Sequence, residues 1–138
     1  MTPVADWSRR LKARRAVSLA RKIFGNLKGR TVLVLGAGEM GKLTAIHMQA
    51  QGIGRLIIAS RTAAHAEILA ESIGGTAVPW ESLSDALAEA DILITATGAS
   101  VPIISRAVIA QTMKVRRQRP LFIIDIALLI AGLAVGAQ

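Results

Sequence analysis

The sequence predicts an α/β domain built around a doubly wound parallel sheet. Short runs of Val, Ile and Leu alternate with segments of helical pattern, and this order indicates right-handed crossovers between parallel strands. Hydrophobic residues form 52% of the 138 positions and aromatic residues only 3%. Such an aliphatic core is typical of strands that helices cover on both faces. The length fits one domain.

A basic helix is expected over residues 7–27, where apolar residues recur at spacings of three and four. The predicted apolar stripe consists of Ala16, Ala20, Ile23 and Leu27, and Gly29 follows as the helix breaker. Residues 1–30 contain nine Lys or Arg and one Asp, whereas the remainder is neutral. We interpret this charge as a solvated helix face, with contact to RNA or another anionic surface as the alternative.

Five strands and four further helices are expected after this segment. The strands lie within 31–38, 55–61, 76–80, 91–99 and 120–127, and the helices within 39–52, 62–75, 81–90 and 105–118. A doubly wound fold arranges these strands in the order 3-2-1-4-5. Pro79 predicts an edge position for the third strand, and Ser82 or Ser84 is available to cap the helix that follows it.

The stretch "VLVLGAGEMGKLTA" contains three glycines spaced as G-x-G-x-x-G, behind a strand and ahead of a helix. A dinucleotide-binding turn requires this context. Gly36 permits the tight turn, Gly38 lets the backbone approach a pyrophosphate, and Gly41 lets the helix pack close to the strand. The helix N-terminus then offers N–H groups to the phosphates. The sequence therefore predicts a Rossmann-like domain, with a tight turn that binds no ligand as the alternative.

The residues after the second strand favour NADP over NAD. An NAD site usually places Asp or Glu about 20 residues beyond the glycines, but this chain has Ser60, Arg61 and Thr62 there. A carboxylate would repel the 2′-phosphate of NADP, whereas a guanidinium and two hydroxyls can bind it. The alternative for Arg61 is a solvated loop residue.

Small residues after the fourth strand leave room for the ribose next to the nicotinamide. The segment "TATGA" offers hydroxyls at Thr95 and Thr97, and its strand adjoins the first strand across the switch point of the sheet. We interpret His47 and His65 as structural residues and Asp125 as a carboxylate at the sheet rim.

Other chemistry is not indicated. The absence of cysteine excludes disulfides, cysteine-ligated zinc and a thiolate nucleophile within these 138 residues. No Ser/His/Asp, metal-ligand or paired-carboxylate pattern is visible. We interpret "KVRRQR", before the last strand, as the solvated end of a helix, where cations suit the helix dipole, with an RNA-binding patch as the alternative.

The chain is expected to divide into a basic helical arm (1–29), an NADP-binding domain (30–128) and an apolar tail (129–138). The run from 121 to 137 approaches the length of a membrane span. Asp125 interrupts it, however, and its first part is typical of a core strand, so we expect no span. The charged N-terminus lacks the apolar core of a secretory signal, and a cytoplasmic location is expected.

Four stretches, "GAGEMG", "LIIASRT", "ATGA" and "RPLFIIDIA", occur in the order and spacing of one known family. Together with the helix before them they resemble the NADPH-binding domain of glutamyl-tRNA reductases, from about Ala13 to Ala127. The resemblance implies a pyrophosphate turn lined by Gly36, Ala37, Gly38, Glu39, Met40 and Gly41, a 2′-phosphate site at Ser60, Arg61 and Thr62, and a nicotinamide side at Thr97 and Gly98.

The family reduces the glutamyl group of charged tRNA to glutamate-1-semialdehyde in tetrapyrrole biosynthesis, with NADPH as the hydride donor. Another domain of the family supplies a cysteine that holds the glutamyl group as a thioester, and a C-terminal domain forms the dimer. This chain has no cysteine, and it reads "LLIAGLAVGAQ" where the family continues toward that C-terminal domain. The resemblance implies NADPH binding without turnover by these residues alone. Glutamyl-tRNA and a dimer partner would require the other domains, and neither a metal nor a membrane partner is expected.

Two other functions remain open. An NADP-dependent dehydrogenase of the shikimate dehydrogenase type can also end its second strand in Asn-Arg-Thr, although the Lys/Asp pair that would distinguish it is not visible. A non-catalytic nucleotide-sensing or interaction module is the other alternative.

Overall fold

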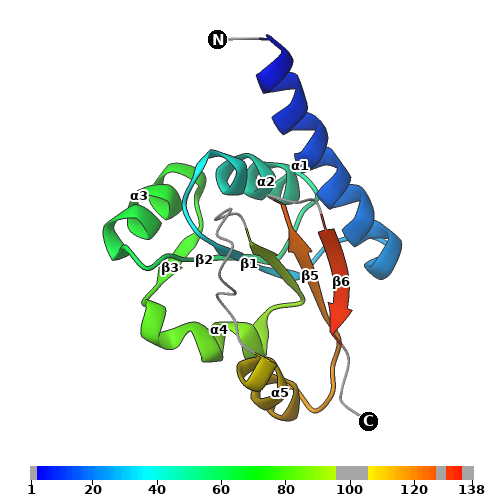
Figure 1. Ribbon diagram of the computed structural model, residues 1–138, viewed down its shortest axis with the longest axis vertical. Helices are drawn as coiled ribbons and strands as arrows, with labels where there is room; N and C mark the ends of the chain where they lie inside the picture. Colours follow the sequence, from blue (N-terminus) through cyan, green and yellow to red (C-terminus); the bar gives the residue numbers. More distant parts are fainter. Residues whose placement is uncertain (1–2, 96–105, 127–129, 135–138) are drawn as a thin grey trace.

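The computed structural model describes residues 3–95, 106–126 and 130–134, which form one six-stranded sheet between two layers of helices (Figure 1). The strands are β1 (Thr31–Leu35), β2 (Arg55–Ala59), β3 (Thr76–Val78), β4 (Ile92–Thr95), β5 (Leu121–Asp125) and β6 (Ile130–Ala134). The helices are α1 (Pro3–Phe24), α2 (Glu39–Gln49), α3 (Ala63–Ile73), α4 (Leu83–Glu89) and α5 (Arg106–Val115), with a 3-10 turn, η1 (Trp80–Ser82), before α4.

The strand order is β3-β2-β1-β4-β5-β6, and β1 to β5 are parallel. This confirms the predicted order of the first five strands and the edge position of the third. The chain leaves β1 in one direction through β2 and β3, and then crosses to the other side at β4. Because right-handed crossovers in opposite directions place their helices on opposite faces, the fold is doubly wound.

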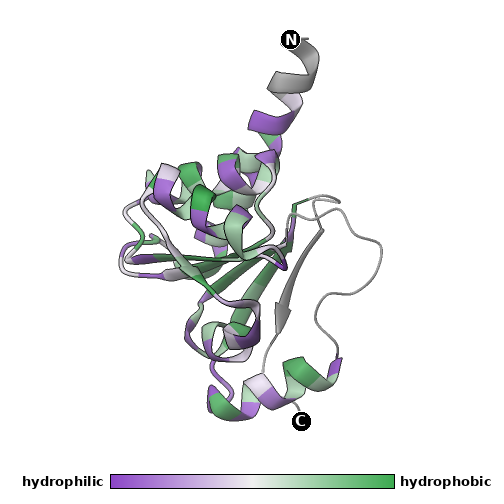
Figure 2. Cartoon of the chain, turned by 90° about the vertical axis from the view of Figure 1, so that its left-hand side faces the viewer, coloured by the Kyte–Doolittle hydropathy of each residue, from purple (hydrophilic) through white to green (hydrophobic). Residues whose placement is uncertain are grey.

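Alternate residues of the strands pack into two separate hydrophobic cores. Val32 and Val34 of β1 pack with residues of α1, α2 and α3 on one face, whereas Leu33 and Leu35 pack with residues of α4 and α5 on the other. Figure 2 shows these two helical layers on either side of the apolar strands. The near-continuous runs of Val, Ile and Leu therefore follow from burial on both faces.

The sixth strand differs from the five-strand expectation. β6 pairs with β5 in antiparallel register, with Ile124 opposite Ala131, in a run that the sequence suggests only as an apolar tail. The run has neither polar alternation nor a recognisable turn signal, so its local pattern does not reveal a strand. Its physical role is to occupy the backbone N–H and C=O groups that the outer edge of β5 would otherwise leave unpaired. Among the described residues, no helix is long and apolar enough to cross a membrane.

Helix α1 is confirmed as an element, but its boundaries and buried face differ from the prediction. It ends at Phe24, and Gly25 follows with a φ of +81°, a conformation that favours glycine at the end of a helix. Ile23 is 46% exposed, so its place in the predicted stripe is wrong. Over residues 8–24 of the helix, the buried residues are Ala13, Ala16, Val17 and Ala20. Small side chains at these positions let α1 pack closely on α2 and the sheet.

Helix α5 is shorter than expected, and the "KVRRQR" segment is not wholly solvated. Arg117 and Gln118 take positive φ values of 55° and 66°, and turn the chain toward β5. Arg116 is only 5% exposed, so its interpretation as part of a solvated helix end is wrong. Neighbouring Arg117 and Arg119 are exposed, as predicted.

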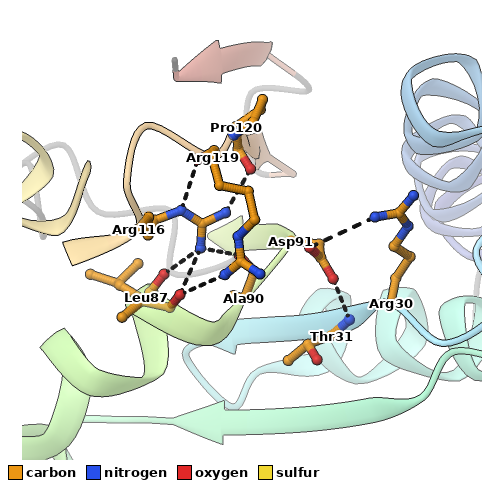
Figure 3. Close-up of polar contacts among 9 residues, drawn as sticks. Arg30, Thr31, Leu87, Ala90, Asp91, Arg116, Arg119 and Pro120 are labelled. Atoms are coloured by element: carbon orange, nitrogen blue, oxygen red, sulfur yellow. Dashed lines mark hydrogen bonds and ion pairs between the residues drawn. The ribbon is translucent and has the colours of Figure 1, made fainter. Parts of the chain in front are cut away.

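The guanidinium of Arg116 fastens α4 to the loop that enters β5 (Figure 3). It donates hydrogen bonds to the backbone carbonyls of Leu87, Ala88, Ala90, Arg119 and Pro120. The bond to Leu87 is 2.8 Å and the bond to Pro120 is 2.6 Å. Burial, reinforced by the charge of Arg119 and opposed by Asp91, lowers the pKa of Arg116, although an arginine still carries its charge at neutral pH.

Asp91 ties the starts of β1 and β4 together beside this cluster (Figure 3). Its carboxylate accepts a hydrogen bond of 2.9 Å from the backbone N–H of Thr31 and lies 3.9 Å from the guanidinium of Arg30. Its own N–H donates to the carbonyl of Thr31 at 2.8 Å, and its carbonyl accepts from Phe122 at 3.0 Å. The amino ends of three neighbouring strands are thus held by polar contacts.

Replacing Arg116 should destabilise the fold, because buried carbonyls would lose their donors. We expect Arg116→Met to lower the free energy of unfolding by about 2–4 kcal/mol in urea denaturation. Arg117→Met removes the same charge from an exposed side chain in the same turn and should change stability by less than about 0.5 kcal/mol. Equal stabilities of the two variants would contradict the role given to Arg116.

Candidate functional site

The carboxyl ends of four strands lie level with one another. The register pairs Leu35 of β1 with Ala59 of β2 and with Thr95 of β4, and it pairs Thr95 with Asp125 of β5. The loops that leave these strands therefore begin at the same edge of the sheet. In open α/β sheets, ligands bind in the crevice at this edge, where the chain reverses direction across the sheet. Here that point lies between β1 and β4.

The turn after β1 starts with a glycine that its geometry requires. Gly36 has a φ of +99°, which a residue with a Cβ rarely adopts. Its N–H donates a 2.9 Å hydrogen bond to the carbonyl of Ala59, one step beyond the last paired residues of β1 and β2. This bond fixes the direction in which the chain leaves the sheet toward α2.

The N-terminus of α2 is open to a ligand. Gly38 is the N-cap residue; it is exposed, it has no side chain that could cap the helix, and an added Cβ would meet no atom of the described residues within 4 Å. The first N–H groups of a helix have no partners within the helix, and together with the helix dipole they attract an anion. Space at Gly38 and free donors behind it fit a phosphate group.

The other residues of the predicted turn have distinct environments. Ala37 and Met40 are half-buried, Glu39 is exposed in the first turn of α2, and Gly41 is buried within the helix. The burial of Gly41 agrees with the close helix packing expected there. Beside this turn, a groove of about 230 Å³ runs between α2 and α3, with Lys42 and His65 among its lining residues.

The predicted phosphate-selective residues follow β2 directly. Arg61 and Thr62 are exposed, and the hydroxyl oxygen of Ser60 accepts a 3.3 Å hydrogen bond from the N–H of Thr62. No carboxylate occurs between Ala59 and His65. The end of β2 therefore presents one cation and two hydroxyls to whatever binds at the turn after β1.

One contact at this end of the sheet was missed by the sequence reasoning. The guanidinium carbon of Arg61 lies 5.7 Å from the ring centroid of Trp80, within the range of a cation–π contact. The only sequence signal is that both residues follow neighbouring strands; the register that brings them together is a property of the folded sheet.

The remaining candidates are less informative. The hydroxyl of Thr95 donates to the carbonyl of Ile124 across a long 3.5 Å, while Thr97 and Gly98 fall outside the described residues. His47 contacts the carbonyl of Leu43 at 2.9 Å within α2, consistent with a structural role. In the described ranges, no group of three His, Cys, Asp or Glu side chains could hold a metal ion.

Comparison with known proteins links this geometry to dinucleotide-dependent enzymes. Residues 18–128 match the family model of shikimate / quinate 5-dehydrogenase. The glutamyl-tRNA reductases of Desulfotalea psychrophila and Bacillus subtilis are 50% and 48% identical to this chain over 112 residues, which is 81% of this chain but 26% and 25% of those proteins.

A solved structure agrees with the sequence comparison. Glutamyl-tRNA reductase from Methanopyrus kandleri superposes with a TM-score of 0.77 at 39% identity, over 83% of this chain and 29% of that chain. The chain thus spans about a quarter of the length of the curated relatives named above. Its fold is that of a Rossmann-type dinucleotide-binding domain.

A substitution at the N-cap residue Gly38 can change ligand binding without lowering the stability of the fold. Gly38 has φ −81° and ψ 179°, which any residue adopts, and serine is a favourable N-cap residue. We expect Gly38→Ser to leave the free energy of unfolding unchanged or slightly raised. The added side chain would occupy the phosphate position, however, and dinucleotide affinity should fall at least about tenfold, or about 1.4 kcal/mol.

Gly36→Ser is the matched control for this experiment. At a φ of +99° the same substitution should lower stability by about 1–2 kcal/mol. Urea denaturation and calorimetric titration would measure both quantities. Undiminished dinucleotide affinity in Gly38→Ser would show that the turn does not hold the phosphates.

Proposed function

We propose that this chain, which belongs to the family of the shikimate / quinate 5-dehydrogenase model, is the NADPH-binding domain of a glutamyl-tRNA reductase. Enzymes of this type are NADP-dependent oxidoreductases, and the chain corresponds to part of one. The observation that carries the proposal is the uncapped N-terminus of α2 behind Gly36 and Gly38, level with Arg61 at the end of β2.

In this proposal the chain's residues bind and orient the cofactor. The backbone N–H groups at the start of α2 would hold the pyrophosphate, with Gly38 leaving the space for it. Arg61, with Ser60 and Thr62, would hold the 2′-phosphate. The ends of β1 and β4 would place the nicotinamide near Thr95, since adenosine and nicotinamide lie on opposite sides of the switch point. NADPH, when bound, supplies the hydride.

The full reaction requires chemistry that these residues do not contain. By its resemblance, the family holds the glutamyl group as a cysteine thioester, and the 138 residues include no cysteine. We therefore assign to this chain only the binding of NADPH, the hydride donor of the reaction. Glutamyl-tRNA, a dimer partner and a cytoplasmic setting belong to the same proposal and rest on the resemblance to the family.

A second candidate is favoured by the description of the matching family model. It names shikimate / quinate 5-dehydrogenase, whose substrate is a small hydroxy acid rather than a charged tRNA. Both candidates use a dinucleotide at the same turn, so cofactor binding cannot separate them. The substrates can separate the two candidates. Shikimate and glutamyl-tRNA would each be offered to a longer protein that carries the remaining domains.

Cofactor preference tests the role of Arg61. We expect the chain to bind NADPH at least about tenfold more tightly than NADH, because the guanidinium neutralises the 2′-phosphate. Arg61→Asp should abolish this preference by replacing attraction with repulsion. Titration followed by NADPH fluorescence would measure both affinities.

Arg117→Asp is the control, because it makes the same change in net charge at an exposed position on the opposite edge of the sheet. It should leave the preference intact. Equal affinities of the unsubstituted chain for NADPH and NADH would remove the argument from the 2′-phosphate.

A turnover assay tests whether this chain binds the cofactor without catalysing the reduction. The purified 138-residue chain should bind NADPH but should not oxidise it in the presence of glutamyl-tRNA, since no cysteine is present to hold the glutamyl group. The Bacillus subtilis enzyme serves as the positive control under the same conditions. Measurable reduction of glutamyl-tRNA by this chain would contradict the assignment.

A further inference from the structure

Trp80 lies beside Arg61 as a direct result of the sheet register. β2 and β3 are parallel, and Ala59 pairs with Val78 at their carboxyl ends. Arg61 is two residues beyond Ala59, and Trp80 is two residues beyond Val78. Each side chain therefore leaves the sheet at the same height, and the guanidinium carbon lies 5.7 Å from the indole ring.

The two partners differ in how firmly they are held. The ring of Trp80 is half-buried and packs against the core beneath α4. Its backbone is fixed by the η1 turn, in which the N–H of Ser82 donates to the carbonyl of Pro79 at 2.9 Å. Arg61, in contrast, is exposed. The aromatic ring is thus held by the core, and the exposed arginine side chain lies over it.

We propose that Trp80 is a positioning residue that holds the guanidinium of Arg61 at the end of β2 for the 2′-phosphate of the dinucleotide. This inference rests on the proposed function. A cation–π contact at 5.7 Å uses one side of the guanidinium, so that N–H donors on its other sides remain available to a phosphate. An arginine that is already restrained loses less rotamer freedom when it binds. Trp80 thereby contributes to cofactor preference through Arg61.

The test compares Trp80→Leu, which removes the aromatic face, with Trp80→Phe, which keeps one. Affinities for NADPH and NADH are measured by calorimetric titration in the full 138-residue chain. We expect Trp80→Leu to weaken NADPH binding two- to fivefold, about the size of an exposed cation–π contact, and to leave NADH binding unchanged. Trp80→Phe should retain most of the preference. Urea denaturation checks that both variants are folded at the temperature of the titration.

A double substitution separates positioning from a merely structural effect. In an Arg61→Ala background, Trp80→Leu should cause no further loss of NADPH affinity, because the ring then has no guanidinium to hold. An equal loss of NADPH and NADH affinity in Trp80→Leu would overturn the inference, since it would indicate a general effect on the site. The inference would also be overturned if Trp80→Leu caused the same loss of NADPH affinity in the Arg61→Ala background as in the unsubstituted chain.

Failure of the proposed function has a different signature. If the unsubstituted chain binds neither dinucleotide, or binds both equally, then the 2′-phosphate site itself is absent. If the chain prefers NADPH, loses the preference in Arg61→Ala and keeps it in Trp80→Leu, only the positioning role of Trp80 is overturned.

Discussion

The parallel register around β1 is the constraint on which the rest of the site depends. Because Leu35 is level with both Ala59 and Thr95, the glycine turn, the Arg61 loop and the end of β4 begin at one edge. A slip of one residue would turn the strand's side chains to the opposite core, and Val32 and Leu33 already belong to different cores. Burial on both faces thus fixes the height at which each of these loops starts.

Polar contacts at the opposite edge hold this register without occupying the site. Arg116 binds the carbonyls at the end of α4 and before β5, and Asp91 binds the N–H of Thr31. Both clusters lie at the amino ends of the strands, across the sheet from Gly38 and Arg61. The carboxyl edge can therefore leave the N-terminus of α2 uncapped, because the strands that support it are fastened elsewhere.

The sequence predicted the features that depend on residues close together in the chain. The strand order followed from alternating strands and helices, and the open turn followed from the spacing of Gly36, Gly38 and Gly41. Three features could not be predicted because they depend on contacts between distant segments. Strand β6 forms because it pairs with the free edge of β5. Arg116 is buried because its guanidinium donates to backbone carbonyls near residue 90. Trp80 lies near Arg61 because of the register between β2 and β3. In sequence, Arg116 is indistinguishable from the exposed Arg117 beside it.

In the proposed function, cofactor choice and substrate choice depend on different residues. The residues assigned to the 2′-phosphate lie in the loop after β2, and Trp80, which follows β3, packs against the core beneath α4. Under this proposal, cofactor preference is a property of short loops supported by this domain's own core. The acceptor of the proposed reaction, in contrast, would be held near the ends of β1 and β4 by a cysteine that these 138 residues do not contain. It follows from the proposal that NADPH preference should be intact in a chain that performs no reduction, because the proposal assigns cofactor binding and acceptor binding to different residues.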